Sequence, residues 1–147
     1  INEIIRICII NLEPKIKHKK LEVDVVLEGD HLYVNGDRDR LIQVITNLAD
    51  NAVKYSNEGG YIRVTSKSRG SKAYISIYND GPAISEEDMR NIWDRFYKAD
   101  KSRTNKISTG LGLSIVRNIL TQHGEDIWAE NKTPDKGVTF TFTLKKK

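Results

Sequence analysis

The chain has 147 residues, of which 38% are hydrophobic and 30% are charged, so it is long enough to bury the core of one globular domain. Its net charge of +4 owes three units to the terminal lysines 145–147, and no aromatic residues interleave with them, which argues against a nucleic-acid surface. The longest apolar run, residues 7–10, is too short to span a bilayer, and no signal-peptide pattern is present. The single cysteine, Cys8, cannot form an internal disulfide and indicates a reducing, cytosolic compartment.

Apolar spacing predicts four elements in the first part of the chain. Asp37 is the expected N-cap of the longest of them, whose core positions follow the helical period. The elements are a helix over 2–13 that frays or turns after Pro14, strands over 21–27 and 32–35 around Gly29-Asp30, and a helix over 38–55 with core residues Leu41, Ile45, Leu48 and Ala52.

The remaining predicted elements are four strands, two helices and one polar loop. They are strands over 61–68 and 73–78 joined at Gly70-Ser71, a helix over 85–93 capped by Ser85, a polar loop over 98–109, a helix over 111–122 closed by Gly124, and strands over 127–130 and 138–144. Strands grouped in hairpins together with separate helices predict an α+β fold. We expect a two-layer α/β sandwich in which a mixed sheet of about five strands packs on about three helices.

The helix over 38–55 carries an unusual polar stripe. Asn47, Asn51, Lys54 and Tyr55 stand at i, i+4, i+7 and i+8, so they project from one side of the helix, beside its core face. Asparagine is a poor helix former, so two of them in mid-helix need an explanation. A neutral amide oxygen suits Mg²⁺ and a lysine suits a phosphate, whereas the alternative is a row of solvated polar positions.

A second segment, Asn79-Asp80-Gly81-Pro82, follows the strand predicted over 73–78. A carboxylate at a strand end can accept a hydrogen bond from the exocyclic amine of adenine, whereas guanine presents an oxygen there and is rejected. The alternative interpretation of Asp80 is an ordinary Asp-Gly turn.

Two more segments are compatible with phosphate binding. Residues 90–103 combine an apolar anchor of Ile92, Trp93, Phe96 and Tyr97 with a basic loop, which describes either a lid over phosphates or a surface helix with a solvated loop. Residues 109–113, Thr-Gly-Leu-Gly-Leu, open the helix over 111–122, where glycines and free N–H groups favour an anion. This sequence is neither a Walker loop nor a dinucleotide fingerprint.

Together, in this order, the four segments resemble the catalytic ATP-binding domain of sensor histidine kinases. This is a branch of the Bergerat-fold (GHKL) ATPases, which include the gyrase B subunit, MutL and the ninety-kilodalton heat-shock chaperone. The resemblance runs from about Asp37 to Leu144: NLADNAVKYS is similar to the N box, NDGPAI to the G1 box, WDRFYK to the F box and STGLGLSIV to the G2 box.

The resemblance implies a cofactor set of ATP and Mg²⁺. Asn51 would hold the metal, Lys54 and Lys98 would contact phosphates, Tyr55 would stack on adenine and Asp80 would recognise it; Asn51, Lys54 and Lys98 form the implied catalytic set. The full implied nucleotide-contacting set is Asn47, Asn51, Lys54, Tyr55, Asp80, Gly81, Ile84, Tyr97, Lys98, Thr109, Gly110, Leu111, Gly112, Leu113 and Thr139.

Three residues depart from the family pattern. Ala83 replaces the usual second glycine of the G1 box, Ser108 the first glycine of the G2 box, and Glu125 the second glycine of a common His-Gly-Gly. If position 83 or 108 needs a positive φ, the substitution costs about 1 kcal/mol or more.

The resemblance also favours phosphotransfer over hydrolysis. Hydrolytic members carry a glutamate where this chain has Asn47, and an amide cannot accept a proton. The expected acceptor is a histidine followed by an acidic residue on a two-helix dimerisation segment, and His18, His31 and His123 do not fit that pattern. We therefore expect the acceptor upstream of Ile1, with a response regulator receiving the phosphoryl group next.

The only methionine is Met89 and the chain opens on Ile1, so we expect an internal piece of a longer, membrane-anchored sensor, of which this is the cytosolic domain. Residues 1–147 would form one catalytic domain, with 1–20 as a linker or a first helix continuing from the dimerisation segment. The alternatives are a nucleotide-binding interaction module with little turnover and, less favoured, a hydrolytic ATPase.

Overall fold

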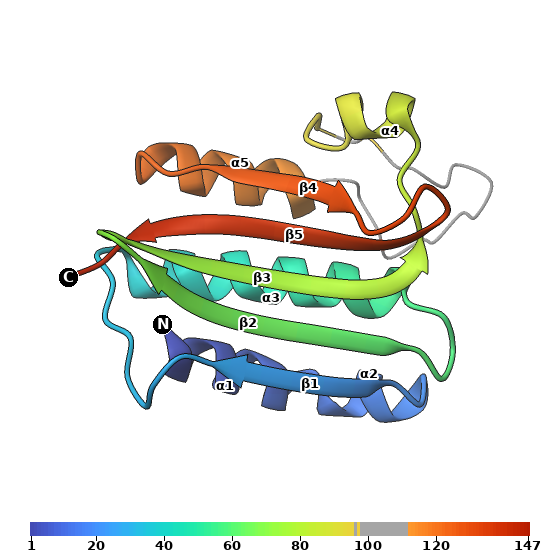
Figure 1. Ribbon diagram of the computed structural model, residues 1–147, viewed down its shortest axis with the longest axis horizontal. Helices are drawn as coiled ribbons and strands as arrows, with labels where there is room; N and C mark the ends of the chain where they lie inside the picture. Colours follow the sequence, from blue (N-terminus) through green and yellow to red (C-terminus); the bar gives the residue numbers. More distant parts are fainter. Residues whose placement is uncertain (96, 98–111) are drawn as a thin grey trace.

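The computed structural model describes residues 1–95, 97 and 112–147. In these ranges five strands form one sheet in the order β1-β2-β3-β5-β4, and the long helices cover one of its faces (Figure 1). The elements are α1 (Asn2–Asn11), α2 (Glu13–His18), β1 (Glu22–Leu27), α3 (Arg38–Tyr55), β2 (Tyr61–Arg69), β3 (Lys72–Pro82), α4 (Glu86–Asn91), α5 (Gly112–Gln122), β4 (Ile127–Asn131) and β5 (Lys136–Lys145). The predicted α+β sandwich with a mixed sheet is confirmed.

The sheet is mixed because β1 lies parallel to β2, while every other neighbouring pair is antiparallel. The chain passes from β1 to β2 through α3, as a parallel pair requires a long crossover. β2 and β3 form the predicted hairpin, with Lys72 opposite Arg69 across the turn. Among the described residues no helix is long and apolar enough to cross a membrane.

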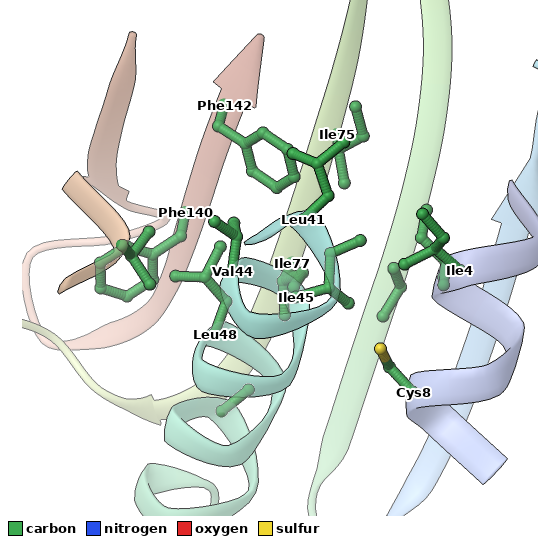
Figure 2. Packing of buried hydrophobic residues seen from close by; sticks show 14 of the residues in the cluster. Ile4, Cys8, Leu41, Val44, Ile45, Leu48, Ile75, Ile77, Phe140 and Phe142 are labelled. Carbon is green, nitrogen blue, oxygen red and sulfur yellow. The ribbon is translucent and has the colours of Figure 1, made fainter. Parts of the chain in front are cut away.

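The core lies between α3 and the sheet (Figure 2). Strict alternation in β3 buries Ala73, Ile75 and Ile77 toward the helices, as expected for a sheet with one covered face. Figure 2 shows Leu41, Val44, Ile45 and Leu48 of α3 near Ile75 and Ile77 of β3 and Phe140 and Phe142 of β5, with Ile4 and Cys8 contributed by α1. All four predicted core residues of α3, Leu41, Ile45, Leu48 and Ala52, are buried.

The first twenty residues form part of the helical layer. α1 buries Ile4, Ile5 and Cys8, so it shares the core with α3. The expectation of a frayed or turning segment after Pro14 is wrong, because a second helix, α2, begins there. Proline in the first turn of a helix has no N–H to lose, so Pro14 starts α2.

The predicted strand over 32–35 is also wrong, since only Val34 forms an isolated bridge, to Lys146. β3 already occupies one side of β5, and β4 covers the other as far as Phe142. The segment therefore meets only the tail after β5, where Asn35 N–H donates to the carbonyl oxygen of Lys145 at 2.8 Å. An extended segment becomes a strand only where a neighbour has free backbone groups.

β3 is longer than the predicted strand over 73–78. It continues to Pro82, which stands opposite Lys136, and the register shifts between Asn79 and Pro82. Asp80 and Gly81 therefore lie in an irregular end of a strand and not in a turn after it. β5 begins at Lys136 and extends the pairing past the Asp-Gly signal.

Candidate functional site

The polar stripe of α3 lies on one side of the helix as predicted. Asn47, Asn51, Lys54 and Tyr55 are all half-buried, beside the buried face of the same helix. The side chain of Asp37 caps this helix by accepting from the N–H of Arg40 at 3.2 Å. The ammonium group of Lys54 lies 5.1 Å from the centroid of the Tyr55 ring, so the last turn of α3 combines a cation with an aromatic face.

Asp80, near the C-terminal end of β3, has a buried carboxylate oxygen. Its Oδ1 is inaccessible to solvent and has no hydrogen-bond partner in the part of the chain that the structure describes. A Cβ added at Gly60 would lie 2.5 Å from this oxygen, so Gly60 provides the close backing of the carboxylate. An unpaired buried acceptor is costly, so this atom fits a ligand that brings a donor, such as an exocyclic amine.

Gly81 brings the end of β3 against the end of α3. A Cβ at this position would stand 1.9 Å from the carbonyl oxygen of Tyr55, a backbone atom that cannot move aside cheaply. Any side chain here would separate Asp80 from the stripe on α3, which explains the glycine. Figure 1 shows the ends of β3 and α3 at the same side of the molecule, near α4.

The predicted site leaves out Asn79, a buried polar residue next to Asp80. Its side chain is 3% exposed, and its Nδ2 is buried without a partner among the described residues. The same nitrogen lies 2.9 Å from the position of a Cβ on Gly81. The signal in the sequence is the Asn-Asp pair before glycine, because an amide donor and a carboxylate acceptor stand at adjacent positions.

The start of α5 lies beside the stripe of α3. Nδ2 of Asn47 donates to the carbonyl oxygen of Gly112 at 3.5 Å. A Cβ on Gly112 would meet no atom of the described residues within 4 Å, and the first turn of a helix leaves N–H groups free for an anion. Leu113 is half-buried against the core. The predicted contacts Lys98, Thr109, Gly110 and Leu111 lie outside the described residues.

Ile84, which follows the end of β3, is held by the end of β4. Its N–H donates to Oδ1 of Asn131 at 2.9 Å, and its carbonyl oxygen accepts from Nδ2 of Asn131 at 2.8 Å. The neighbouring Ala83 N–H donates to the carbonyl oxygen of Asp135 at 3.2 Å. Lys20 is the non-glycine residue of the described ranges with a positive φ, so alanine at position 83 brings no backbone strain.

Of the other two departures from the family pattern, Ser108 lies outside the described residues, and Glu125 lies away from the Ala83 contact. The carboxylate of Glu125 is 5% exposed and forms an ion pair with Lys72, at the far end of β3. It also accepts from the hydroxyl of Thr143 at 2.9 Å, so Glu125 joins the start of β3 to the end of β5.

The aromatic anchor after α4 is partly described. Trp93 packs edge-on against Phe140 of β5 with ring centroids 5.9 Å apart, and the guanidinium of Arg117 lies 5.9 Å from the Trp93 ring. The hydroxyl of Tyr97 donates to the carboxylate of Asp88, and this hydrogen bond raises the pKa of Tyr97 above its ordinary value. Phe96 and the predicted lid over 98–109 lie outside the described residues.

Thr139 is not brought to the other predicted residues. It stands opposite Tyr78 and Glu130 in the sheet, on the face that the helices do not cover. Val138 faces the helices instead, buried opposite Asn79. Because side chains alternate along a strand, Thr139 and Val138 lie on opposite faces of the sheet, and the predicted nucleotide contact of Thr139 stays a prediction.

Helices on one face of a mixed sheet, a polar stripe on α3 and an oxygen of Asp80 that is buried and unpaired among the described residues are consistent with an α+β domain that binds a nucleotide. The chain belongs to the family described as histidine kinase-, DNA gyrase B- and HSP90-like ATPases, whose model matches residues 36–147.

Known proteins of this kind are similar to the chain. Sensor histidine kinase WalK of Bacillus subtilis is 40% identical over 131 residues, covering 87% of this chain and 21% of that protein. The catalytic domain of histidine kinase ThkA has a TM-score of 0.88 at 36% identity, covering 99% of this chain and 92% of that one. ThkA in complex with the response regulator TrrA has a TM-score of 0.84 at 33% identity, covering 100% of this chain and 40% of that one. The chain spans 21% to 26% of the length of its curated relatives, which are sensor proteins.

Proposed function

We propose that this chain binds Mg-ATP and donates the γ-phosphoryl group to a histidine on a separate dimerisation segment, as the catalytic domain of a two-component sensor kinase. The observation that carries the proposal is that Oδ1 of Asp80, in the last part of β3, is buried without a partner among the described residues. That atom requires a donor from a ligand, and adenine supplies one where guanine does not.

The stripe on α3 suits the rest of the nucleotide. The ring of Tyr55 offers a face for the base, and the ammonium of Lys54 can pair with a phosphate. The amide oxygen of Asn51 is a suitable Mg²⁺ ligand, and the ion, when bound, neutralises charge on the phosphate oxygens. The start of α5 at Gly112, which accepts a hydrogen bond from Asn47, supports a phosphate contact there.

The same residues support transfer to another group and not to water. An imidazole nitrogen attacks the γ-phosphorus, the bond to the β–γ bridging oxygen breaks, and ADP leaves with that electron pair. Such a reaction depends on positioning and charge stabilisation more than on a protein base. Asn47 cannot take a proton from water, and its amide already donates to Gly112.

The histidines of this chain do not suit the acceptor role. The N–H of Asp37 donates to Nε2 of His123 at 3.1 Å, so the proton of that ring is on Nδ1, which donates to the carbonyl oxygen of Ile119 at 2.8 Å. Both nitrogens of His123 are therefore used within the fold, and His31 stacks on Tyr33. We place the acceptor in a dimerisation segment of the parent protein, and a response regulator as the next recipient, as the ThkA–TrrA complex suggests by analogy.

Phosphotransfer to an added dimerisation segment tests the proposal. This chain is incubated with labelled Mg-ATP, alone and with the acceptor segment of the parent. The chain alone should remain unlabelled and hydrolyse ATP negligibly, while the added segment should acquire an acid-labile, base-stable adduct typical of a P–N bond.

Each contrary outcome has a distinct meaning. Binding of ATP with no transfer to the segment would favour the nucleotide-binding interaction module. Rapid hydrolysis by the chain alone would favour the hydrolytic branch of the family. Equal affinity for ATP and GTP would contradict the role of Asp80.

A further inference from the structure

The side chain of Lys19 ends on the last turn of α3. Its Nζ donates to the carbonyl oxygens of Val53 and Lys54, each at 2.8 Å. The last carbonyls of a helix have no partner within the helix and carry its negative end, so an ammonium group is a favourable cap there. Lys19 precedes the region that matches the family model, yet it holds the turn that presents Lys54 and Tyr55.

The backbone of Lys19 holds the loop that follows the same helix. Its carbonyl oxygen accepts from the N–H of Gly59 at 2.9 Å. The next residue, Gly60, is fixed from the other side, because its carbonyl oxygen accepts from the N–H of Glu22 at 2.9 Å. Gly60 is also the residue that backs the carboxylate of Asp80. One residue therefore anchors both the helix end and the loop at this edge of the site.

A tight turn with a left-handed residue, Lys20, follows Lys19. Lys20 has a φ of +57°, a left-handed conformation that is unfavourable for a non-glycine residue. The turn is closed by the N–H of Leu21, which donates to the carbonyl oxygen of Ile16 at 3.0 Å, as at the end of many helices. This turn sends the chain into β1 while the Lys19 side chain stays directed at α3.

We propose that Lys19 is a positioning residue of the adenine pocket: it fixes the last turn of α3 and residues 57–60 relative to Asp80, and thereby sets the preference for adenine over guanine. The inference rests on the proposed function. A lysine that only stabilised the fold would affect all nucleotides equally. A positioning residue affects the nucleotide that uses Oδ1 of Asp80 more than the one that does not.

The test compares Lys19→Met with Lys17→Met. Methionine keeps much of the length of the lysine stem and removes the ammonium, while Lys17 is an exposed neighbour on α2 that pairs with Glu13. Calorimetry measures the dissociation constants of Mg-ATP and Mg-GTP for each variant, after circular dichroism has confirmed folding. Lys19→Met should weaken ATP binding about 5-fold to 10-fold, because the hydrogen bond between Asp80 and adenine loses its best geometry. It should weaken GTP binding less than 2-fold. Lys17→Met should change neither.

Equal losses for both nucleotides, or no loss, would overturn the inference. If Lys19→Met does not fold, Lys19→Gln replaces it. A shorter, uncharged amide is a weaker cap than an ammonium group, so this variant should lower the ATP-to-GTP preference by a smaller factor, and an unchanged preference would again overturn the inference. Failure of the wild-type chain to bind ATP would contradict the proposed function itself. Wild-type binding that Lys19 variants leave unchanged would contradict this inference alone.

Discussion

Asn131, the last residue of β4, pairs with the backbone of Ile84 through both ends of its side-chain amide, at 2.8 Å and 2.9 Å. The pair joins the β4 end to the segment that leads from Asp80 into α4. Because the two residues are far apart in sequence, the amide substitutes for a strand partner at a point where the regular ladder has ended.

Replacement of Asn131 by alanine should therefore destabilise the fold. Loss of two partly exposed hydrogen bonds should lower the free energy of unfolding by about 1–2 kcal/mol. Urea denaturation measures this change. The control is Asn35→Ala, whose side chain makes no hydrogen bond to the described part of the chain and should cost less than about 0.5 kcal/mol. Equal losses in the two variants would show that the Asn131 pair contributes nothing of its own.

Asp80→Asn should weaken the preference for ATP over GTP. The amide of asparagine can donate as well as accept, so it removes the rejection of the guanine oxygen, at about 1–3 kcal/mol of discrimination. Competition between the two nucleotides, followed by calorimetry, measures the ratio of affinities. Asp135→Asn, an exposed residue of the β4–β5 turn, serves as the control. A preference that survives unchanged in Asp80→Asn would assign adenine recognition to another residue.

Asn51→Ala should remove the dependence of ATP binding on Mg²⁺ while the fold remains intact. The side chain is half-buried beside the core face of α3, so its loss leaves the packed residues in place. Calorimetric titration with ATP, with and without magnesium, gives the dependence, and Gln43→Ala on the exposed side of the same helix is the control. If a folded Asn51→Ala protein keeps the wild-type magnesium dependence, the metal is held elsewhere.

Lys20→Gly should stabilise the protein. Glycine adopts a φ of +57° without the clash of a Cβ. This relief should exceed the larger conformational entropy that glycine loses on folding, for a net gain in stability of about 0.5–1 kcal/mol. Lys17→Gly, inside α2, should have the opposite sign and cost about 1 kcal/mol. Thermal denaturation of the two variants gives both signs in one experiment. A loss of stability in Lys20→Gly would mean that the lysine side chain contributes more than its strain removes.

Cys8 should react slowly with thiol reagents in the folded protein. Its side chain is 2% exposed, and burial raises the pKa of the thiol above its ordinary value despite a hydrogen bond from Thr46. The thiolate is the reactive form, so modification at pH 8 should accelerate sharply in urea.

Because the folded-state pKa of Cys8 is the higher one, the stability linked to this group is complete below the unfolded-state pKa and decreases as pH rises toward the folded-state value. Cys8→Val should remove that component of the alkaline decrease.

Local sequence patterns predicted the elements whose stabilising contacts are local. The helix over 38–55 was predicted at the observed bounds because its cap, Asp37, and its core residues all lie within one continuous helical period. The same reasoning placed the cap of α4 at Ser85, which accepts from the N–H of Asp88. Local patterns did not predict the strand bounds at 32–35 and at 79–82. The length of a strand depends on whether a neighbouring strand has backbone groups that are free to pair with it.

The sequence by itself determined the family, the sandwich and the stripe of Asn47, Asn51, Lys54 and Tyr55, because a helix with a fixed period orders its own side chains. Only the tertiary structure decided that Oδ1 of Asp80 is buried without a partner among the described residues, that Val138 and not Thr139 faces the helices, and that Lys19 caps α3. These features join residues such as Lys19 and Val53, 34 positions apart, and Ile84 and Asn131, 47 positions apart. A local pattern shows that a side chain can donate or accept a hydrogen bond, but the packing of elements distant in sequence determines which group is its partner.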